Sequence, residues 1–457
     1  MLELPPKQCV QDVSMTQSDS AASAEPRELV RLSTDALREF RDRERARYEA
    51  IKARATPFNL ARGKPATEQV ALANQLLTAV ATPEQCWTED GNDCRNYYGS
   101  PQGLIEARRL FAAMLGAPPE LVLVANNSSL ALMHDALVYA LLTGASDGAA
   151  SWRDQHRPIR FLCPSPGYDR HFQICEQYGI EMIAVPLTGA GPDMDEVERL
   201  AADPAVKGMW CVPKYSNPTG ETYSSETVAR LARMAAAGDF RLFWDNAYAV
   251  HDLTGRSDRL DNVLDACSAA GNPDRALVFG STSKITFAQA GLGMLATSTA
   301  NMRWFVSRQS TRTIGPDKLN QLRHVLVLRD EAGISAHMEQ QRRLLEPKFA
   351  AVQEVFKARL GGTGVAAWTQ PRGGYFVSLD VLDACAQRVV ALAKGAGIEM
   401  VPAGRTFPYG RDPRDRNIRI APSFPPADEV RAAVDALATC VLVATSERLL
   451  ADRGVNA

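Results

Sequence analysis

The sequence predicts an α/β fold in which a mostly parallel sheet is buried between helices. From about residue 85 to 320, short apolar runs alternate with longer stretches of helical periodicity, which is typical of strands joined by crossover helices. The continuous apolar character of these runs indicates strands that are covered on both faces. Polar residues gather directly after the runs, where open α/β sheets bind their ligands. The six runs lie at residues 121–124, 160–163, 182–185, 206–212, 241–244 and 275–279.

The two ends of the chain predict further helices and strands. Residues 31–54 carry dense charges with apolar side chains at three- and four-residue steps, as in an amphipathic surface helix. After about residue 325 we expect a long charged helix through Lys348, then strands at residues 374–379 and 418–420, and a closing helix.

These patterns predict a division of the chain into two domains and an extension. The first residues are polar and rich in Ser and Ala, which is typical of a flexible segment. We expect an N-terminal extension at 1–27, a large domain at 81–325, and a smaller α+β domain assembled from 28–80 and 326–457.

Charge and cysteine usage exclude several classes of partner. The 51 basic and 53 acidic residues leave a net charge of -2, so we expect a small-molecule partner rather than nucleic acid or a membrane. The nine cysteines include no CxxC pair and the six histidines show no close ligand spacing, so no metal site is expected. The first residues lack the basic and apolar regions of a signal peptide, and we therefore expect a cytoplasmic protein.

Lys284 follows a hydroxyl-rich turn at the end of a predicted strand. A lysine amine in this position can condense with an aldehyde, and the Ser281 and Ser283 hydroxyls beside it can hold a phosphate. Taken alone, however, such a segment more often contains an ordinary solvated loop lysine, because most lysines are exposed surface residues.

Asp245 and Tyr248 close another predicted strand and lie three residues apart. A buried carboxylate can keep a pyridine nitrogen protonated, and a phenol can donate to an oxygen on the ring. An N-cap aspartate followed by a packing tyrosine would give the same pattern.

The order in which such residues follow successive strands is more informative than any one of them. Residues 217–220 on their own are turn dipeptides. The whole set is more informative, because each of its members follows the end of a predicted strand and they occur in one sequence order. The set is Asn127, Ser128, Ser129, Tyr168, Asn217, Asp245, Tyr248, Ser281 and Lys284.

With these motifs, residues 58–422 resemble the fold type I pyridoxal-phosphate (PLP) enzymes, and specifically the class I/II aminotransferases related to aspartate aminotransferase. Phrases at 60–65, 127–130 and 314–320 resemble a divergent bacterial subgroup of that family. The resemblance implies a large PLP-binding domain with a seven-stranded, mostly parallel sheet, a smaller α+β domain, and PLP as the cofactor.

The resemblance also assigns roles around the cofactor. Lys284 matches the Schiff-base lysine, Asp245 the partner of the pyridine nitrogen, and Asn217 and Tyr248 the pair that binds the ring 3-oxygen. Tyr168 takes the place of the aromatic residue that stacks on the ring. The residues that match the phosphate-binding positions are Asn127, Ser128, Ser129, Ser281 and Ser283.

Three further positions match residues that bind substrate or join subunits. Arg419 matches the arginine that grips the substrate α-carboxylate, for which the guanidinium fork is suited. Gly63 resembles the mobile glycine that closes over the substrate. Tyr98, with Tyr97 as the alternative, resembles the tyrosine that reaches the phosphate of the neighbouring subunit, which implies a homodimer with shared sites.

One position departs from the family pattern. Many relatives carry a phosphate-binding arginine eight residues after the lysine, where this chain has Leu292. Lys318 or Arg312 could supply the missing charge. For a distal carboxylate of the substrate, the candidates are Arg62, Lys64 and Arg312.

The resemblance implies transamination between an amino acid, with aspartate or another common L-amino acid expected, and a 2-oxo acid such as 2-oxoglutarate. A β-lyase, decarboxylase or racemase on the same scaffold is the alternative within enzymes. A PLP-binding transcription regulator would need a basic DNA-binding module before residue 58, and the residues there are not strongly basic.

Overall fold

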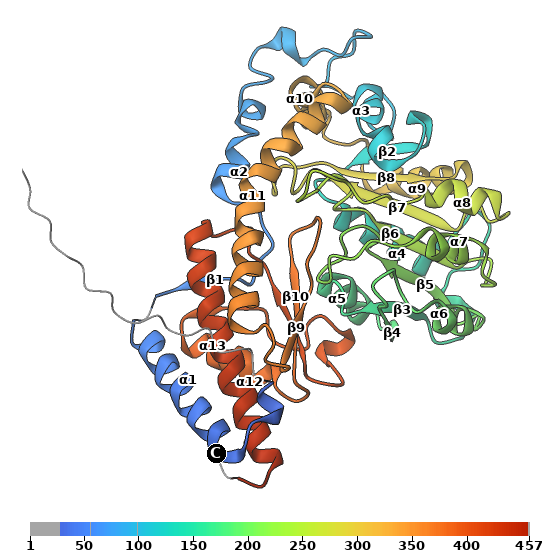
Figure 1. The fold of residues 1–457 in the computed structure, drawn as a ribbon. Helices are drawn as coiled ribbons and strands as arrows, with labels where there is room; N and C mark the ends of the chain where they lie inside the picture. The colour runs from blue at the N-terminus through green and yellow to red at the C-terminus, as the bar shows by residue number, and fades with distance from the viewer. Residues whose placement is uncertain (1–27, 55, 98, 456–457) are drawn as a thin grey trace, which may run out of the picture.

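The computed structural model describes residues 28–54, 56–97 and 99–455, and it is built on a seven-stranded sheet (Figure 1). The strand order is β2-β8-β7-β6-β5-β3-β4, and neighbouring strands are parallel except at β8, which runs antiparallel to β2 and β7. The predicted α/β fold with a mostly parallel seven-stranded sheet is therefore confirmed. The strands are β2 (Val122–Ala125), β3 (Arg160–Ser165), β4 (Glu181–Pro186), β5 (Val206–Cys211), β6 (Arg241–Asp245), β7 (Ala276–Ser281) and β8 (Gly293–Thr297).

The apolar runs located six of these strands and missed β8. This strand has five residues and begins at Gly293, and the preceding segment 288–292 contains only one polar side chain, that of Gln289, so no polar cluster marks where the strand begins. β7 also extends two residues beyond its predicted end, so Ser281 belongs to the strand itself.

Helices cover both faces of the sheet, as buried parallel strands require. One face packs against α4 (Ser129–Thr143), α5 (Asp169–Gln177) and α9 (Thr299–Arg312). The other face packs against α3 (Ile105–Leu115), α6 (Met194–Ala201), α7 (Ser225–Arg233), α8 (Val263–Ala269) and α10 (Lys318–Leu328).

A third core joins the two ends of the described chain, with α1 and α13 side by side in Figure 1. It contains the antiparallel sheet β12-β10-β9, and the short strand β1 pairs parallel with β11 nearby. The predicted division into domains at residues 80/81 and 325/326 stays a prediction. The elements are α1 (Thr34–Arg54), β1 (Phe58–Asn59), α2 (Thr67–Ala71), α11 (Glu331–Arg359), β9 (Ala366–Trp368), β10 (Val377–Val381), α12 (Ala386–Gly395), β11 (Ile398–Glu399), β12 (Asn417–Ile420) and α13 (Ala427–Asp452).

The bounds of two predicted elements were wrong. The expected single helix ending at Lys348 is two helices: Arg329 adopts a φ of 63°, and the Asp330 side chain accepts from Gly333 N to begin α11. α11 then continues to Arg359, because Val352, Val355 and Phe356 still pack into the core. The predicted strand at 374–379 begins three residues later, because Gly374 takes a φ of 84° against the Tyr215 backbone.

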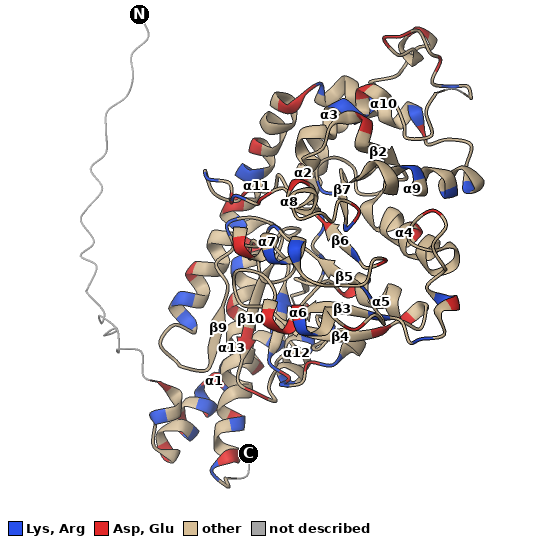
Figure 2. Cartoon of the chain, turned by 90° about the vertical axis from the view of Figure 1, so that its right-hand side faces the viewer, with Lys and Arg blue, Asp and Glu red and all other residues tan. Residues whose placement is uncertain are grey.

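Lys and Arg are interspersed with Asp and Glu over the chain in Figure 2, in keeping with the near-neutral net charge. None of the helices in the described residues is long and apolar enough to cross a membrane.

Phe243 anchors the strand that carries Asp245. Its ring lies 5.5 Å from Phe161, 4.8 Å from Trp210 and 5.9 Å from Phe279 between ring centroids, and it is fully buried. We predict that Phe243→Ala destabilises the protein by about 3–5 kcal/mol, through lost burial and the cavity left behind. The check is the denaturant midpoint, with Leu142→Ala on the exposed face of α4 as the control. A shift no larger than that of the control would contradict it.

Candidate active site

Side chains from five strand ends line one cavity at the carboxyl edge of the seven-stranded sheet. The cavity has a volume of about 330 Å³. Because parallel strands end at the same edge, residues more than 150 positions apart in the sequence meet there. The predicted site residues that line it are Asn127, Ser128, Ser129, Tyr168, Asn217, Asp245, Tyr248, Ser281, Ser283 and Lys284.

The turn after β2 forms the N-terminal end of a helix. Ser128 is the N-cap of α4 and its hydroxyl accepts from Ala131 N at 3.4 Å. Asn126, with a φ of 58°, gives the tight bend that precedes it. The unpaired N–H groups and the helix dipole make this end of α4 an anion-binding position. Across the cavity, the buried Ser283 hydroxyl has no hydrogen-bond partner among the described residues.

Lys284 enters the cavity beyond the end of β7. Its Nζ lies 4.9 Å from the centroid of the Tyr248 ring. Burial lowers the pKa of Lys284, and the nearby Asp245 charge opposes this shift. A larger fraction of the amine is therefore neutral than in an exposed lysine.

The backbone of Lys284 is held from the other side by a buried polar network. Tyr375 Oη donates to the Lys284 carbonyl at 3.3 Å, and Gln341 Nε2 donates to the next carbonyl, of Ile285, at 3.1 Å. His337 Nε2 lies 2.6 Å from the same Ile285 oxygen. Gln69 Nε2 in turn donates to Tyr375 Oη at 3.1 Å. The position of the lysine is thus fixed by residues of α2, α11 and the segment before β10.

Asp245 ends β6 and is almost fully buried. His171 Nε2 lies 3.1 Å from Asp245 Oδ2, and the imidazole stacks on Trp210 at 4.4 Å between ring centroids. Asp245 Oδ1 has no partner within the described part of the chain and is buried against the cavity. The carboxylate is therefore anchored on one oxygen and free to accept on the other.

His171 was not identified from the sequence. It lies three residues after Tyr168, and three-residue spacing at the start of a helix places two side chains on one face. The ring centroids of the two residues are 4.9 Å apart. This spacing is the signal that could have pointed to His171.

Asn217 and Tyr248 lie beside Asp245 in the cavity. Asn217 is buried, and its Oδ1 is unpartnered within the described residues. Burial raises the pKa of Tyr248 well above its usual range, so its phenol stays protonated and can donate. Burial likewise raises the pKa of Tyr168 to about 12.

The structure places Arg419 and Gly63 outside the lining of this cavity but next to it. Arg419 lies on β12, and its guanidinium stands 4.9 Å from the centroid of the Phe376 ring. Arg419 Nη1 lies 3.2 Å from Oδ1 of Asp169, the residue that directly follows Tyr168. The Arg419 charge partly opposes the rise that burial causes in the pKa of Tyr168 and Tyr248. A Cβ on Gly63 would stand 2.3 Å from Phe376 Cζ, so the Gly63 backbone closes directly over that ring.

The remaining predicted positions separate into buried and exposed groups. Leu292 is part of the apolar core beneath the sheet. Arg312 donates to Asn126 Oδ1 at 2.8 Å and pairs with Asp135 at 3.1 Å, so it supports the turn before α4. Lys318 is buried at the start of α10 and lines a different surface notch. Tyr98 lies outside the described residues, and Tyr97 is 80% exposed.

The side chains that were predicted to bind a distal carboxylate of the substrate do not line the cavity. The ammonium of Lys64 lies 3.8 Å from the centroid of the Phe424 ring, and Arg62 is exposed. Neither residue lines the cavity that contains Lys284.

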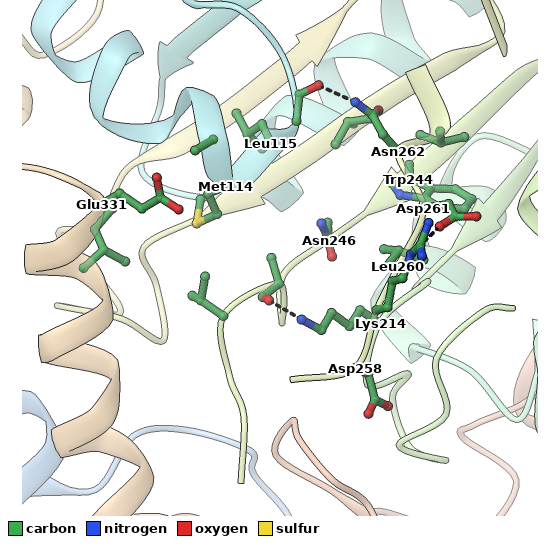
Figure 3. Close-up of a pocket in the computed structure, with 18 of the residues that line it drawn as sticks. Met114, Leu115, Lys214, Trp244, Asn246, Asp258, Leu260, Asp261, Asn262 and Glu331 are labelled. Atoms are coloured by element: carbon green, nitrogen blue, oxygen red, sulfur yellow. Dashed lines mark hydrogen bonds and ion pairs between the residues drawn. The ribbon is translucent and has the colours of Figure 1, made fainter. Parts of the chain in front are cut away.

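A second cavity, of about 410 Å³, lies on the face of the sheet that α3 and α8 cover (Figure 3). Trp244 and Asn246 flank Asp245 in the sequence and point to this side, because strand side chains alternate. It contains the buried Lys214, whose Nζ donates to Ala249 O and Ser257 Oγ, both at 2.8 Å. Lys214 is therefore held by two acceptors, away from the turn that precedes α4.

Comparison with known proteins places the chain among proteins of one family. The model of the family described as "Aspartate amino-transferase" matches residues 32–453 of this chain. A Mycolicibacterium smegmatis protein with a provisional aminotransferase name is 49% identical over 425 residues, 92% of this chain and 99% of that protein. The aspartate aminotransferase of Corynebacterium glutamicum is 44% identical over 409 residues, 89% of this chain and 94% of that protein.

Solved structures show the same fold. The crystal structure of an aspartate transaminase from Corynebacterium glutamicum has a TM-score of 0.90 and 42% identity, covering 93% of this chain and all of that chain. An α-aminoadipate aminotransferase from Thermus thermophilus, complexed with N-(5'-phosphopyridoxyl)-L-leucine, has a TM-score of 0.70 at 20% identity, covering 92% and 96% of the two chains. The latter likeness concerns the fold alone.

The lowered pKa of Lys284 predicts a stability cost that depends on pH. Below the usual lysine pKa of 10.5, the unfolded chain binds a proton more readily than the folded protein, so burial of Lys284 destabilises the fold. We predict that Lys284→Met raises the melting temperature of the cofactor-free protein at pH 7. This gain should shrink as the pH rises towards 10.5.

Thermal unfolding from pH 7 to 10.5 measures this difference. Lys52→Met, at an exposed position of α1, is the control. A gain in melting temperature that does not change with pH would arise from the apolar side chain alone and would contradict a lowered pKa.

Proposed function

The chain belongs to the aspartate aminotransferase family and is an aminotransferase that acts on amino acids and 2-oxo acids, and from this premise we propose a cofactor, substrates and residue roles. The cofactor is pyridoxal phosphate, bound at Lys284. The amino donor is L-aspartate or another common L-amino acid, and the acceptor is a 2-oxo acid such as 2-oxoglutarate. The gathering of ten predicted residues around one cavity at Lys284 is the observation that carries this proposal.

The polar atoms left without partners fit the cofactor. Buried acceptors and hydroxyls normally have hydrogen-bond partners, so unpartnered ones that line a cavity point to a polar ligand. Asp245 Oδ1, Asn217 Oδ1 and Ser283 Oγ are such atoms among the described residues. The free carboxylate oxygen matches a protonated ring nitrogen and the Ser283 hydroxyl matches a phosphate, while the Asn217 amide can reach a ring oxygen through its Nδ2 donor.

The residues that would hold the phosphate lie at the turn before α4. Asn127, Ser128 and Ser129 supply the helix N-terminus, with Ser281 and Ser283 on the facing strand end. Arg312 binds Asn126 and so holds this turn in shape. On the ring, Tyr168 supplies a stacking face and Tyr248 donates from a phenol that stays protonated.

When bound, pyridoxal phosphate supplies an aldehyde that condenses with amines and a ring that withdraws electrons from the carbon bearing the amino group. Asp245 supplies the negative charge that keeps a ring nitrogen protonated, while His171 holds its other oxygen. Burial keeps a larger share of Lys284 neutral, and only a neutral amine is a nucleophile or base. Lys284 Nζ would hold the cofactor through its aldehyde carbon, with loss of water, and once the substrate amine has displaced it, the neutral Nζ would serve as the base that carries the proton of the substrate Cα.

Arg419 receives the α-carboxylate of the substrate. Its Nε is buried and unpartnered among the described residues, as a donor reserved for a ligand would be. Gly63 lies over Phe376, the ring on which Arg419 stacks, and a larger residue there would displace that ring. L-aspartate is favoured as donor because relatives at 44% and 42% identity are named as acting on it.

The test of this proposal uses purified holoenzyme and a panel of L-amino acids with 2-oxoglutarate. We predict that L-aspartate is a good donor, and that Lys284→Ala abolishes transamination and the covalent attachment of PLP while the protein stays folded. Attachment is measured by mass spectrometry after borohydride reduction, and folding by circular dichroism. Lys214→Ala is the matched buried control. A PLP adduct that persists in Lys284→Ala would remove Lys284 from its role.

We also propose that the protein is a homodimer with shared active sites, in which Tyr98 reaches the partner subunit. Exposed apolar side chains on the surface that carries Tyr97 support the proposal. Tyr97 is 80% and Ile314 75% exposed, and both line the same surface notch. Such side chains are typical of surfaces that a second subunit covers.

Subunit exchange tests this arrangement. We predict that Lys284→Ala and Tyr98→Ala, each inactive alone, regain activity when mixed, because the heterodimer has one site with both defects and one with neither. An equal mixture should reach about a quarter of wild-type activity. Tyr97→Ala in place of Tyr98→Ala tests the alternative residue. A monomer by light scattering, or no recovery for either tyrosine after verified exchange, would contradict a shared site.

A further inference from the structure

Asp169 forms an ion pair with Arg419 that joins two parts of the fold. Asp169 is the first residue of α5 beside the seven-stranded sheet, whereas Arg419 lies on β12 in the three-stranded sheet. Arg419 Nη1 donates to Asp169 Oδ1 at 3.2 Å, and the two side chains are 8% and 18% exposed. Low exposure reduces the screening of such a pair by water and salt.

The two contacts of the Arg419 guanidinium constrain it in different ways. The guanidinium carbon lies over the Phe376 ring, 4.9 Å from its centroid, which confines the group to that face of the ring but still allows it to turn and slide. The hydrogen bond from Nη1 to Asp169 removes this remaining freedom. Because the planar guanidinium contacts Phe376 with its face and Asp169 through Nη1, the directions of its remaining N–H donors are defined.

The donor that remains is placed for a ligand. A guanidinium can bind one carboxylate along the edge formed by Nε and Nη2 and another at Nη1. Asp169 takes Nη1, and Nε is buried with no partner in the described part of the chain. The edge that contains Nε is therefore kept for a second carboxylate.

The backbone beside Asp169 is also tied to the strand that carries Arg419. Gly167 N donates to Thr406 O at 2.6 Å, and Thr406 Oγ1 donates to Asn417 Oδ1 at 2.9 Å. Asn417 is two residues before Arg419 on β12. Both the backbone and the ion pair thus fix the distance between the substrate arginine and the cavity.

We infer that Asp169 is a positioning residue that aims Arg419 at the α-carboxylate of the substrate. Asp169 does not itself touch the reacting atoms. It orients the guanidinium so that one edge meets every amino acid and 2-oxo acid that enters, and it therefore sets KM for both substrates together. This inference rests on the proposed role of Arg419.

Steady-state kinetics of the holoenzyme with L-aspartate and 2-oxoglutarate test the inference. Asp169→Ala should raise KM for both substrates by on the order of tenfold with a smaller change in kcat, because a guanidinium that is no longer oriented binds the carboxylate more weakly, and loss of uniform binding raises KM while kcat changes little. Asp169→Asn keeps an oxygen that accepts from Nη1 and should restore most of the loss. Asp169→Glu keeps the charge but moves it, and should behave like Asp169→Ala.

The matched control is Asp239→Ala, which removes a different buried ion pair. Lys207 Nζ and Asp239 Oδ2 are 2.7 Å apart, and their side chains are 3% and 17% exposed. Asp239 does not line the cavity of Lys284, so this change should lower stability without moving KM. If Asp169→Ala does not fold, the comparison of Asp169→Asn with Asp169→Glu decides the matter.

Two sets of results separate this inference from the proposal on which it rests. If Arg419→Ala leaves KM unchanged, Arg419 is not the carboxylate anchor and both ideas fail. If Arg419→Ala raises KM but Asp169→Ala leaves it unchanged or lowers it, or if Asp169→Asn is as impaired as Asp169→Ala, the positioning role alone is overturned. Because both residues act through one contact, the double variant should be no worse than Arg419→Ala.

Discussion

A carboxylate buried at the end of a central strand is the constraint around which the site is organised. Removing Asp245 from water is costly unless both of its oxygens have partners. The fold satisfies one oxygen with His171, which is itself held flat against Trp210. The other oxygen faces the cavity without a partner among the described residues. A cationic N–H donor that enters the cavity at this point would remove that cost, which is the physical basis of the proposed pairing of Asp245 with a protonated ring nitrogen.

Burial also affects Lys284, which is a cation when protonated, whereas Asp245 is an anion when ionised. Its amine loses hydration in the cavity, and its neutral form is favoured. The backbone beneath it is meanwhile bound tightly, by Tyr375 at the Lys284 carbonyl and by Gln341 and His337 at the next one. A rigid backbone and a poorly solvated amine together give a nucleophile with a defined position. The residues that provide this rigidity lie on α11 and before β10, outside the seven-stranded sheet.

The sequence was sufficient to predict the residues at the ends of strands, but not their supports. Asp245, Asn217 and Lys284 follow apolar runs, and parallel strands must bring such positions to one edge. Gln341 and Tyr375 lie on different elements from the residues that they contact, and no local pattern marks those contacts, whereas His171 was indicated only by its three-residue spacing from Tyr168. β8 was missed for a related reason, because its pairing with β2 and β7 depends on the sheet as a whole. These contacts and this strand depend on residues that are distant in the sequence, and the periodicity of the local sequence does not reveal them.

Leu292 stands where many relatives have a phosphate-binding arginine, and the packing around it explains why an apolar residue fits this position. The Leu292 side chain is buried in the apolar core, where an arginine would need a counter-ion that its neighbours do not offer. Its backbone N–H donates to Thr282 Oγ1 at 2.8 Å, so this loop is fixed through the main chain. Positive potential at the turn before α4 must then come from the helix dipole and from Arg312, which binds Asn126. Because Arg312 is also paired with Asp135, the helix N-terminus is left as the principal attraction for a phosphate at this end of the cavity.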